Sequence, residues 1–145
     1  MYDASIVRGI LEQAATELAA PYLKAYIASL REEVEAIRRA AQARDLDDYA
    51  RHILAFHRII VEASGNSVLL RVWDSLMLEV RTRITLTQLT LALPEVAELH
   101  VPIVQALVRG DGKEGGRLLR EHAEMFFWSE KAARVKEVEP ETQSS

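Results

Sequence analysis

The chain has 145 residues and no cysteine, 49% of its residues are hydrophobic, and its formal net charge is −4. This length suffices for one domain that buries its own core. Because no apolar run approaches the ~18 residues of a membrane span and the N-terminus lacks a signal-peptide pattern, we expect no membrane association. The absence of cysteine excludes disulfides and thiolate metal sites and fits a reducing compartment, so we expect a cytoplasmic protein. A net negative charge is not typical of a nucleic-acid-binding domain, which carries a patch of basic residues.

Apolar residues recur at three- and four-residue intervals along most of the chain, and no segment shows the strict alternation typical of a strand. This pattern predicts an all-α fold. Capping residues, prolines and glycines divide the chain into six helices, over residues 4–19, from 21 to about 41, from 45 or 47 to 64, 67–89, 94–109 and from about 113 onward. In the first helix we expect a buried face made of Ile6, Ile10, Ala14 and Leu18. The last polar residues, 138–145, are expected to form a disordered tail.

Pro102 falls inside the predicted fifth helix, two residues after His100. A proline at this place removes one helical hydrogen bond, so it should kink the helix or free the carbonyl of Glu98. The bend is either simply tolerated or serves to aim His100, and the sequence alone leaves both interpretations open.

Three histidines, His57, His100 and His122, lie on the apolar stripes of three different predicted helices. A single histidine on such a stripe is usually an ordinary core residue. If these helices pack together, however, all three rings point into one cavity. Three neutral imidazoles are a familiar set of zinc ligands that leaves a fourth position for water or a ligand oxygen. His52 lies about 140° around the helix from His57 and is expected to stay outside this cavity.

Four groups of residues, weak singly, are together fairly specific. They are Val7-Arg8-Gly9-Ile10-Leu11-Glu12, then Phe56-His57 with Ala63-Ser64-Gly65-Asn66, then His100-x-x-Ile103-x-x-Ala106-Leu107-x-x-Gly110-Asp111, and finally His122. In this order the chain resembles the FCD domain, the all-helical C-terminal effector-binding domain of FadR-subfamily GntR transcription regulators. The resemblance extends from about Tyr2 to about Ala133.

The resemblance implies an antiparallel bundle of six to seven helices that forms a homodimer and binds a small organic acid. Many family members hold a divalent metal at the floor of the pocket through one aspartate and three histidines. His57, His100 and His122 match the three histidines. The aspartate belongs four residues before the first histidine, where this chain has Ile53.

This departure has two physical outcomes. A metal, with zinc expected and nickel as the alternative, would bind through three nitrogens, and water or the carboxylate of the effector would complete its shell. Otherwise the pocket holds no metal and the imidazoles donate hydrogen bonds directly to an anionic ligand. We favour the metal.

The resemblance also suggests residues that bind the effector. Arg8 matches an arginine that faces the acid group in some members, and a guanidinium suits a carboxylate. The alternative role of Arg8 is a weak ion pair with Glu12 along the first helix. Arg83 and Arg81 fall where members carry arginines on the fourth helix, with Arg83 the better candidate. Asn66 is a further candidate, although it suits a helix cap better.

The sequence therefore predicts a non-enzymatic ligand-sensing domain of a GntR/FadR-like transcription regulator over residues 1–137. Family members carry a winged helix-turn-helix before this domain; we expect it to be trimmed from this chain and to be the only part that contacts DNA. One alternative is a metal-dependent helical-bundle hydrolase, but no acidic residue is evidently placed as a general base beside the histidines. The other is a dimerisation module with a vestigial pocket.

Overall fold

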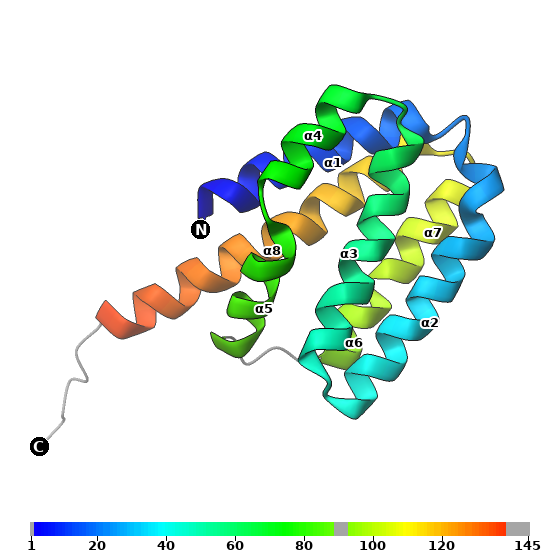
Figure 1. Ribbon diagram of the computed structural model, residues 1–145. Coiled ribbons are helices and arrows are strands. Elements are labelled where there is room, and N and C mark those ends of the chain that lie inside the picture. Colours follow the sequence, from blue (N-terminus) through cyan, green and yellow to red (C-terminus); the bar gives the residue numbers. More distant parts are fainter. Residues whose placement is uncertain (1, 89–92, 139–145) are drawn as a thin grey trace, which may run out of the picture.

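The computed structural model describes residues 2–88 and 93–138, and within these ranges it contains helices and no strand. The all-α bundle predicted from the sequence is confirmed (Figure 1). The expected tail lies almost wholly outside the described residues. None of the described helices is both long and apolar enough to cross a bilayer. The elements are α1 (Tyr2–Ala19), a 3₁₀ turn (Leu23–Tyr26), α2 (Ile27–Ala43), α3 (Leu46–Ala63), α4 (Ser67–Ser75), α5 (Leu78–Gln88), α6 (Leu93–Glu98), α7 (His100–Val108) and α8 (Gly112–Val138).

Helices α1 and α8 lie side by side although they come from opposite ends of the chain (Figure 1). Glycines on α8 allow the two backbones to approach closely. A Cβ on Gly112 would lie 2.6 Å from the Ala20 Cβ, and one on Gly116 would lie 3.0 Å from the Gln13 carbonyl oxygen. The first turn of α8 therefore packs on the end of α1, so the two helices run antiparallel.

Helix α3 packs against α1, α2 and α5 and lies near the centre of the bundle (Figure 1). It begins where the Asp45 side chain accepts a hydrogen bond from the Asp48 amide, a standard N-cap. Its buried residues recur every three or four positions and form the stripe expected from the sequence; they include Tyr49, Ile53, Phe56, His57 and Ile60. Because His57 belongs to this stripe, its side chain points into the core.

The expected buried face of α1 is wrong. Ile10 and Leu18 are each 49% exposed, whereas the buried positions are Arg8, Gly9, Glu12, Ala15, Thr16 and Ala19. Two ionisable side chains occupy the inner face of this helix. A search for apolar periodicity selects the opposite face, because it treats charged residues as solvent-exposed.

The predicted fourth helix is interrupted. Helix α4 ends at Ser75 and α5 begins at Leu78, with Met77 between them at φ +50°. This left-handed conformation ends an α-helix and costs a non-glycine residue about 1 kcal/mol. The Arg81 Nε donates to the Leu76 carbonyl oxygen at 2.7 Å and so satisfies an acceptor left at the break.

The predicted fifth helix is also divided, rather than kinked. Helix α6 ends at Glu98, and α7 begins at His100, so Pro102 is the third residue of a new helix. The N–H that proline lacks belongs to a first turn, where no helical partner exists for it. The break therefore places His100 at the very start of α7.

Candidate metal centre

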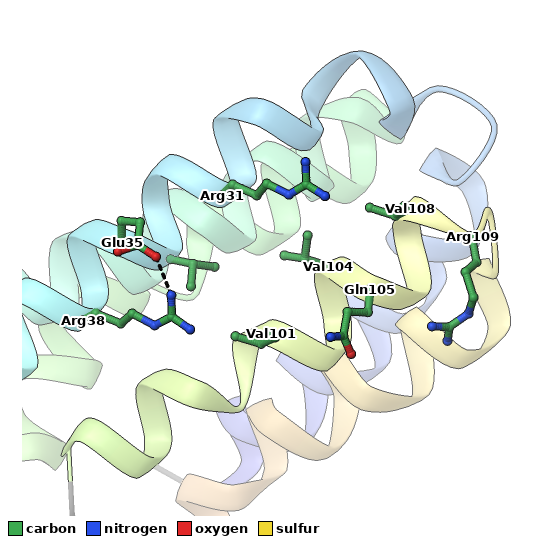
Figure 2. Close-up of a pocket in the computed structure, with 9 residues that line it drawn as sticks. Arg31, Glu35, Arg38, Val101, Val104, Gln105, Val108 and Arg109 are labelled. Carbon is green, nitrogen blue, oxygen red and sulfur yellow. Dashed lines mark hydrogen bonds and ion pairs between the residues drawn. The ribbon is translucent and has the colours of Figure 1, made fainter.

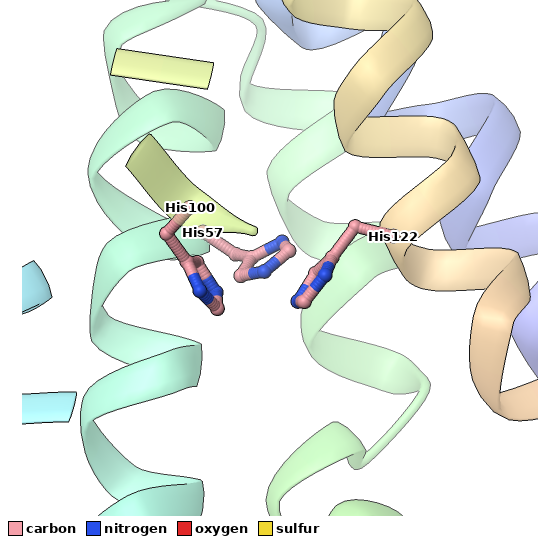
Figure 3. Close-up of side chains that lie close together, drawn as sticks. All are labelled: His57, His100 and His122. Atoms are coloured by element: carbon pink, nitrogen blue, oxygen red, sulfur yellow. The ribbon is translucent and has the colours of Figure 1, made fainter. Parts of the chain in front are cut away.

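Three histidine rings meet in the interior of the bundle. His57 comes from α3, His100 from α7 and His122 from α8, and their rings point toward one another (Figure 3). Each offers a ring nitrogen, and these three nitrogens all lie within 4.8 Å of one another. His57 and His100 are fully buried and His122 is 4% exposed. The spacing and the nitrogen donors suit a tetrahedral ion held by three protein ligands.

Hydrogen bonds determine the tautomer of two of these rings. The His57 Nδ1 lies 2.8 Å from the Glu12 Oε2, and the His100 Nδ1 lies 3.0 Å from the Ala97 carbonyl oxygen. An ionised carboxylate and a carbonyl only accept, so each Nδ1 carries the proton and donates it. Each Nε2 of the neutral ring then carries a lone pair. Both Nε2 atoms are buried without a hydrogen-bond partner in the described part of the chain.

The surroundings also keep the rings neutral. Burial lowers the pKa of His57 and lowers that of His100 to about 3, and it holds the pKa of His122 well below its usual range. The nearby positive charge of Arg8 acts in the same direction on all three. At neutral pH the imidazoles are therefore uncharged, the state in which one ring nitrogen can bind a metal.

Glu12 is a fully buried carboxylate that the sequence analysis left outside the site. Its Oε1 accepts from the Arg8 Nε and from the Trp73 Nε1, both at 2.9 Å, while its Oε2 faces His57. Burial raises the pKa of Glu12, but the charge of Arg8 and the bonds from His57 and Trp73 outweigh it and lower the pKa to about 2. Glu12 is therefore an acidic residue beside His57 that the sequence did not reveal. The signal in the sequence is the Arg8–Glu12 spacing of four, which predicts a weak pair along the first helix as the alternative to effector binding by Arg8.

Ile53 occupies the position where the family pattern has an aspartate, one turn before His57. Its side chain is fully buried and belongs to the main hydrophobic core. The carboxylate of Glu12 contacts the cluster instead, with its Oε2 2.8 Å from the His57 Nδ1.

The arginines predicted to contact an effector lie in different surroundings. Arg8 is buried, and its Nη2 has no hydrogen-bond partner in the described part of the chain. Arg81 bonds to the carbonyl oxygen of Leu76. The Arg83 side chain is 43% exposed and forms ion pairs with Glu79 at 2.9 Å and Asp47 at 3.3 Å. The structure therefore brings Arg8 near the histidines and directs Arg83 toward surface acids.

Asn66 acts as a helix cap. Its Oδ1 accepts a hydrogen bond from the Leu69 amide at 3.0 Å, at the start of α4. The residue is exposed. The oxygen that would contact an effector is therefore already engaged with the backbone.

A separate groove lies between α2 and α7 (Figure 2). Its volume is about 690 Å³. Valines of both helices form its floor, and arginines stand along its edges. Arg38 in this groove pairs with Glu35 and, through two hydrogen bonds at 2.7 and 2.9 Å, with Glu98. The groove is open and carries its charges on exposed or half-exposed side chains.

Comparison with known proteins agrees with this architecture. The family model of the FCD domain matches residues 3–125. The chain is also 32% identical, over 127 residues, to the probable D-xylose utilization operon transcriptional repressor of Paenarthrobacter nicotinovorans. That match covers 88% of this chain and 56% of the relative, so the chain spans about half the length of that repressor. The chain belongs to the FCD domain family.

Proposed function

We propose that this domain is the effector-sensing part of a transcription regulator and that it binds a small organic acid at a metal ion held by His57, His100 and His122. The observation that carries the proposal is the meeting of one ring nitrogen from each histidine within 4.8 Å of the others. The buried Nε2 atoms of His57 and His100 support it, because they have no hydrogen-bond partner in the described part of the chain. Burying unsatisfied acceptors is costly, so such a cluster suits a ligand that accepts their lone pairs. The relative described above is named a probable transcriptional repressor, which supports a regulatory role for this chain.

Zinc fits this donor set better than other common ions. Nitrogen-rich sites suit zinc, with nickel as the alternative, and three protein ligands leave at least one position open. Ile53 supplies no negative charge, so none of the proposed ligands would neutralise the charge of the ion. Glu12 would act on it only indirectly, through His57. The charge of Arg8 already balances that of Glu12. The site therefore favours an anionic ligand.

Arg8 extends the proposed site toward the acid group of the effector. Its Nε donates to Glu12, while its buried Nη2 has no hydrogen-bond partner among the residues that the structure describes. A carboxylate bound to the ion would accept a hydrogen bond from this nitrogen and remove the cost of leaving it unsatisfied. We include Arg8 with the effector-binding residues and assign no such contact to Arg81, Arg83 or Asn66, whose bonds lie elsewhere.

The position of Glu12 favours sensing over hydrolysis. A general base must reach the water that a metal activates. Glu12 instead accepts three hydrogen bonds, one of them from the Nδ1 of His57, the nitrogen opposite the one that would bind the ion. Its low pKa also makes it a weak base. We therefore propose a binding domain and not an enzyme.

An effector changes regulation only if it binds one arrangement of the protein better than another. We propose that the domain acts in the cytoplasm as a homodimer, in which acid binding shifts the placement of a winged helix-turn-helix beyond this chain. DNA contact then comes from that separate domain.

The test uses protein purified without a histidine tag. Elemental analysis should give about one zinc or nickel per chain, and His100→Ala should lose the metal while remaining helical by circular dichroism. His52→Ala is the matched control, because His52 lies outside the cluster, and it should keep the metal. Metal content that is equal in the wild type and in His100→Ala would remove His100 from the site.

Effector binding is measured separately, by melting the zinc-loaded protein with acetate, malate and citrate. An acid present at 100 times its Kd stabilises the folded state by about 2.7 kcal/mol, which raises the Tm of a domain of this size by about 5 °C or more. No shift with any carboxylate, in protein that holds its metal, would contradict the sensor and favour the dimerisation module. Turnover of an ester or amide substrate would favour the hydrolase.

A further inference from the structure

Glu12 joins three helices at one buried carboxylate. The carboxylate comes from α1, and its partners are Arg8 on the same helix, Trp73 on α4 and His57 on α3. All of these side chains are at least 96% buried. Since no solvent competes for these bonds, their pattern determines which atoms carry protons.

The two oxygens of Glu12 have different partners. The Oε1 accepts hydrogen bonds from the Arg8 Nε and from the indole Nε1 of Trp73. Among the described residues, the Oε2 faces only the His57 Nδ1, at 2.8 Å. A guanidinium and an indole donate but cannot accept. The atom at the Oε1 position must therefore be an acceptor, whereas the atom at the Oε2 position decides whether the Nδ1 of His57 donates or accepts.

We propose that Glu12 is a positioning residue that sets the tautomer of His57 and thereby controls metal affinity without touching the ion. It holds the proton on Nδ1 and leaves the lone pair of Nε2 directed to the cluster. This inference rests on the proposed metal centre. It adds a fourth residue, on a fourth helix, to a site whose other members are histidines.

The change Glu12→Gln separates this role from simple packing, because the two side chains have nearly the same shape. Arg8 and Trp73 hold the amide oxygen on their side, which turns the NH₂ group toward His57. That group can only donate, so Nδ1 must become the acceptor and the ring proton moves to Nε2. The proton then occupies the position where His57 would bind the ion.

Two measurements test this prediction. In metal-free protein, the ¹⁵N chemical shifts of the imidazole should show His57 protonated at Nδ1 in the wild type and at Nε2 in Glu12→Gln. Zinc affinity, measured against a chromophoric chelator, should fall by about 100-fold in the variant, the upper end of the effects known for residues behind a ligand. The folded state is checked by circular dichroism.

The chain offers a matched control. The His52 Nδ1 lies 2.7 Å from the Glu33 Oε2, a pair of the same type away from the cluster. Glu33→Gln should leave zinc affinity unchanged. Trp73→Phe removes one donor to Oε1 but keeps the carboxylate, so it should keep the His57 tautomer and lower zinc affinity by less than Glu12→Gln does.

The outcomes distinguish this inference from the proposed function. Wild-type protein that binds no zinc, yet shows the change of tautomer, would overturn the metal centre and retain the role of Glu12 on His57. Equal zinc affinity in wild type and Glu12→Gln would overturn the inference alone. So would a His57 protonated at Nε2 in the wild type, a result that does not depend on whether the variant folds.

Discussion

The histidine cluster and the α2–α7 groove both lie between helices, yet they differ in how their polar groups are held. In the cluster, His57, His100 and Glu12 are fully buried, and each has a hydrogen bond to a partner that is itself buried or part of the backbone. In the groove, Arg31 and Arg109 stand exposed at the edges (Figure 2). The cluster is therefore preorganised, while the groove presents exposed and half-exposed charges.

The difference shows where chemistry can be specific. A buried donor keeps one protonation state and one direction, so a ligand pays little to order it. An exposed arginine is hydrated and changes rotamer freely, so it attracts anions without selecting among them. Removing a group should have a large effect in the cluster and a small one in the groove, and the following predictions test that contrast.

The largest effect is expected from Glu12→Ala. The change leaves Arg8 charged and buried, and it leaves the Trp73 indole and the His57 Nδ1 without their acceptor. Breaking a buried ion pair by removing one member costs about 3–5 kcal/mol. Urea unfolding should show this loss in the free energy of unfolding. Glu33→Ala, which breaks a partly exposed pair with His52, should cost less than about 1 kcal/mol.

Ile53→Asp should separate metal affinity from stability. The change restores a carboxylate one turn before His57 and should tighten zinc binding about 10-fold or more, since an anionic oxygen joins the shell. Without metal, the same carboxylate is buried and unpaired, so the free energy of unfolding should fall by about 2 kcal/mol or more. Calorimetry with zinc, and urea unfolding with chelator, measure the two effects. Equal stability of the metal-free proteins would show that the aspartate reaches solvent.

The cluster should also make stability depend on pH. The pKa of each of the three histidines is lowered in the folded state, to about 3 for His100. Below about pH 6.5 the unfolded chain therefore binds protons that the folded chain excludes, and the free energy of unfolding falls as the pH falls. Each ring contributes a slope approaching about 1.4 kcal/mol per pH unit. Glu12 adds to the loss only below pH 4.5, where its unfolded form takes a proton.

Urea unfolding of metal-free protein at pH 7.5, 6.5 and 5.5 measures this slope. His100→Gln removes one excluded proton and should make the slope between pH 6.5 and 5.5 shallower by about 1 kcal/mol per pH unit. A wild-type free energy of unfolding that is flat between pH 6.5 and 5.5 would mean that the rings are accessible to solvent.

The sequence predicts the parts of this molecule that follow apolar periodicity. The stripe of α3 and the convergence of three histidines could be inferred because each lies at a regular position among apolar residues. The inner face of α1 could not, since its buried members include Arg8 and Glu12, which pattern rules assign to solvent. Only the three-dimensional packing of α1 against α3 and α4 brings their partners together.

The helix breaks show a second limit. The end of α4 depends on the left-handed conformation of Met77, a residue without a strong preference for it. Pro102 was visible in the sequence, but a proline fits both a kinked helix and the first turn of a new one. In the structure Pro102 lies in the first turn of α7, and His100 begins that helix.

The smallest effect is expected in the groove. Arg38→Ala removes the pairs with Glu35 and Glu98, but all three side chains are at least 35% exposed. Surface pairs of this kind contribute about 0.2–1 kcal/mol, and the two parallel bonds to Glu98, which join α2 to α6, place this one near the upper limit. Urea unfolding at low ionic strength and in 1 M NaCl should show the difference between wild type and variant shrinking with salt, because exposed charges are screened. A loss above about 2 kcal/mol that salt does not reduce would mean that Arg38 is held as rigidly as Glu12. The contrast between the histidine cluster and the groove would then disappear.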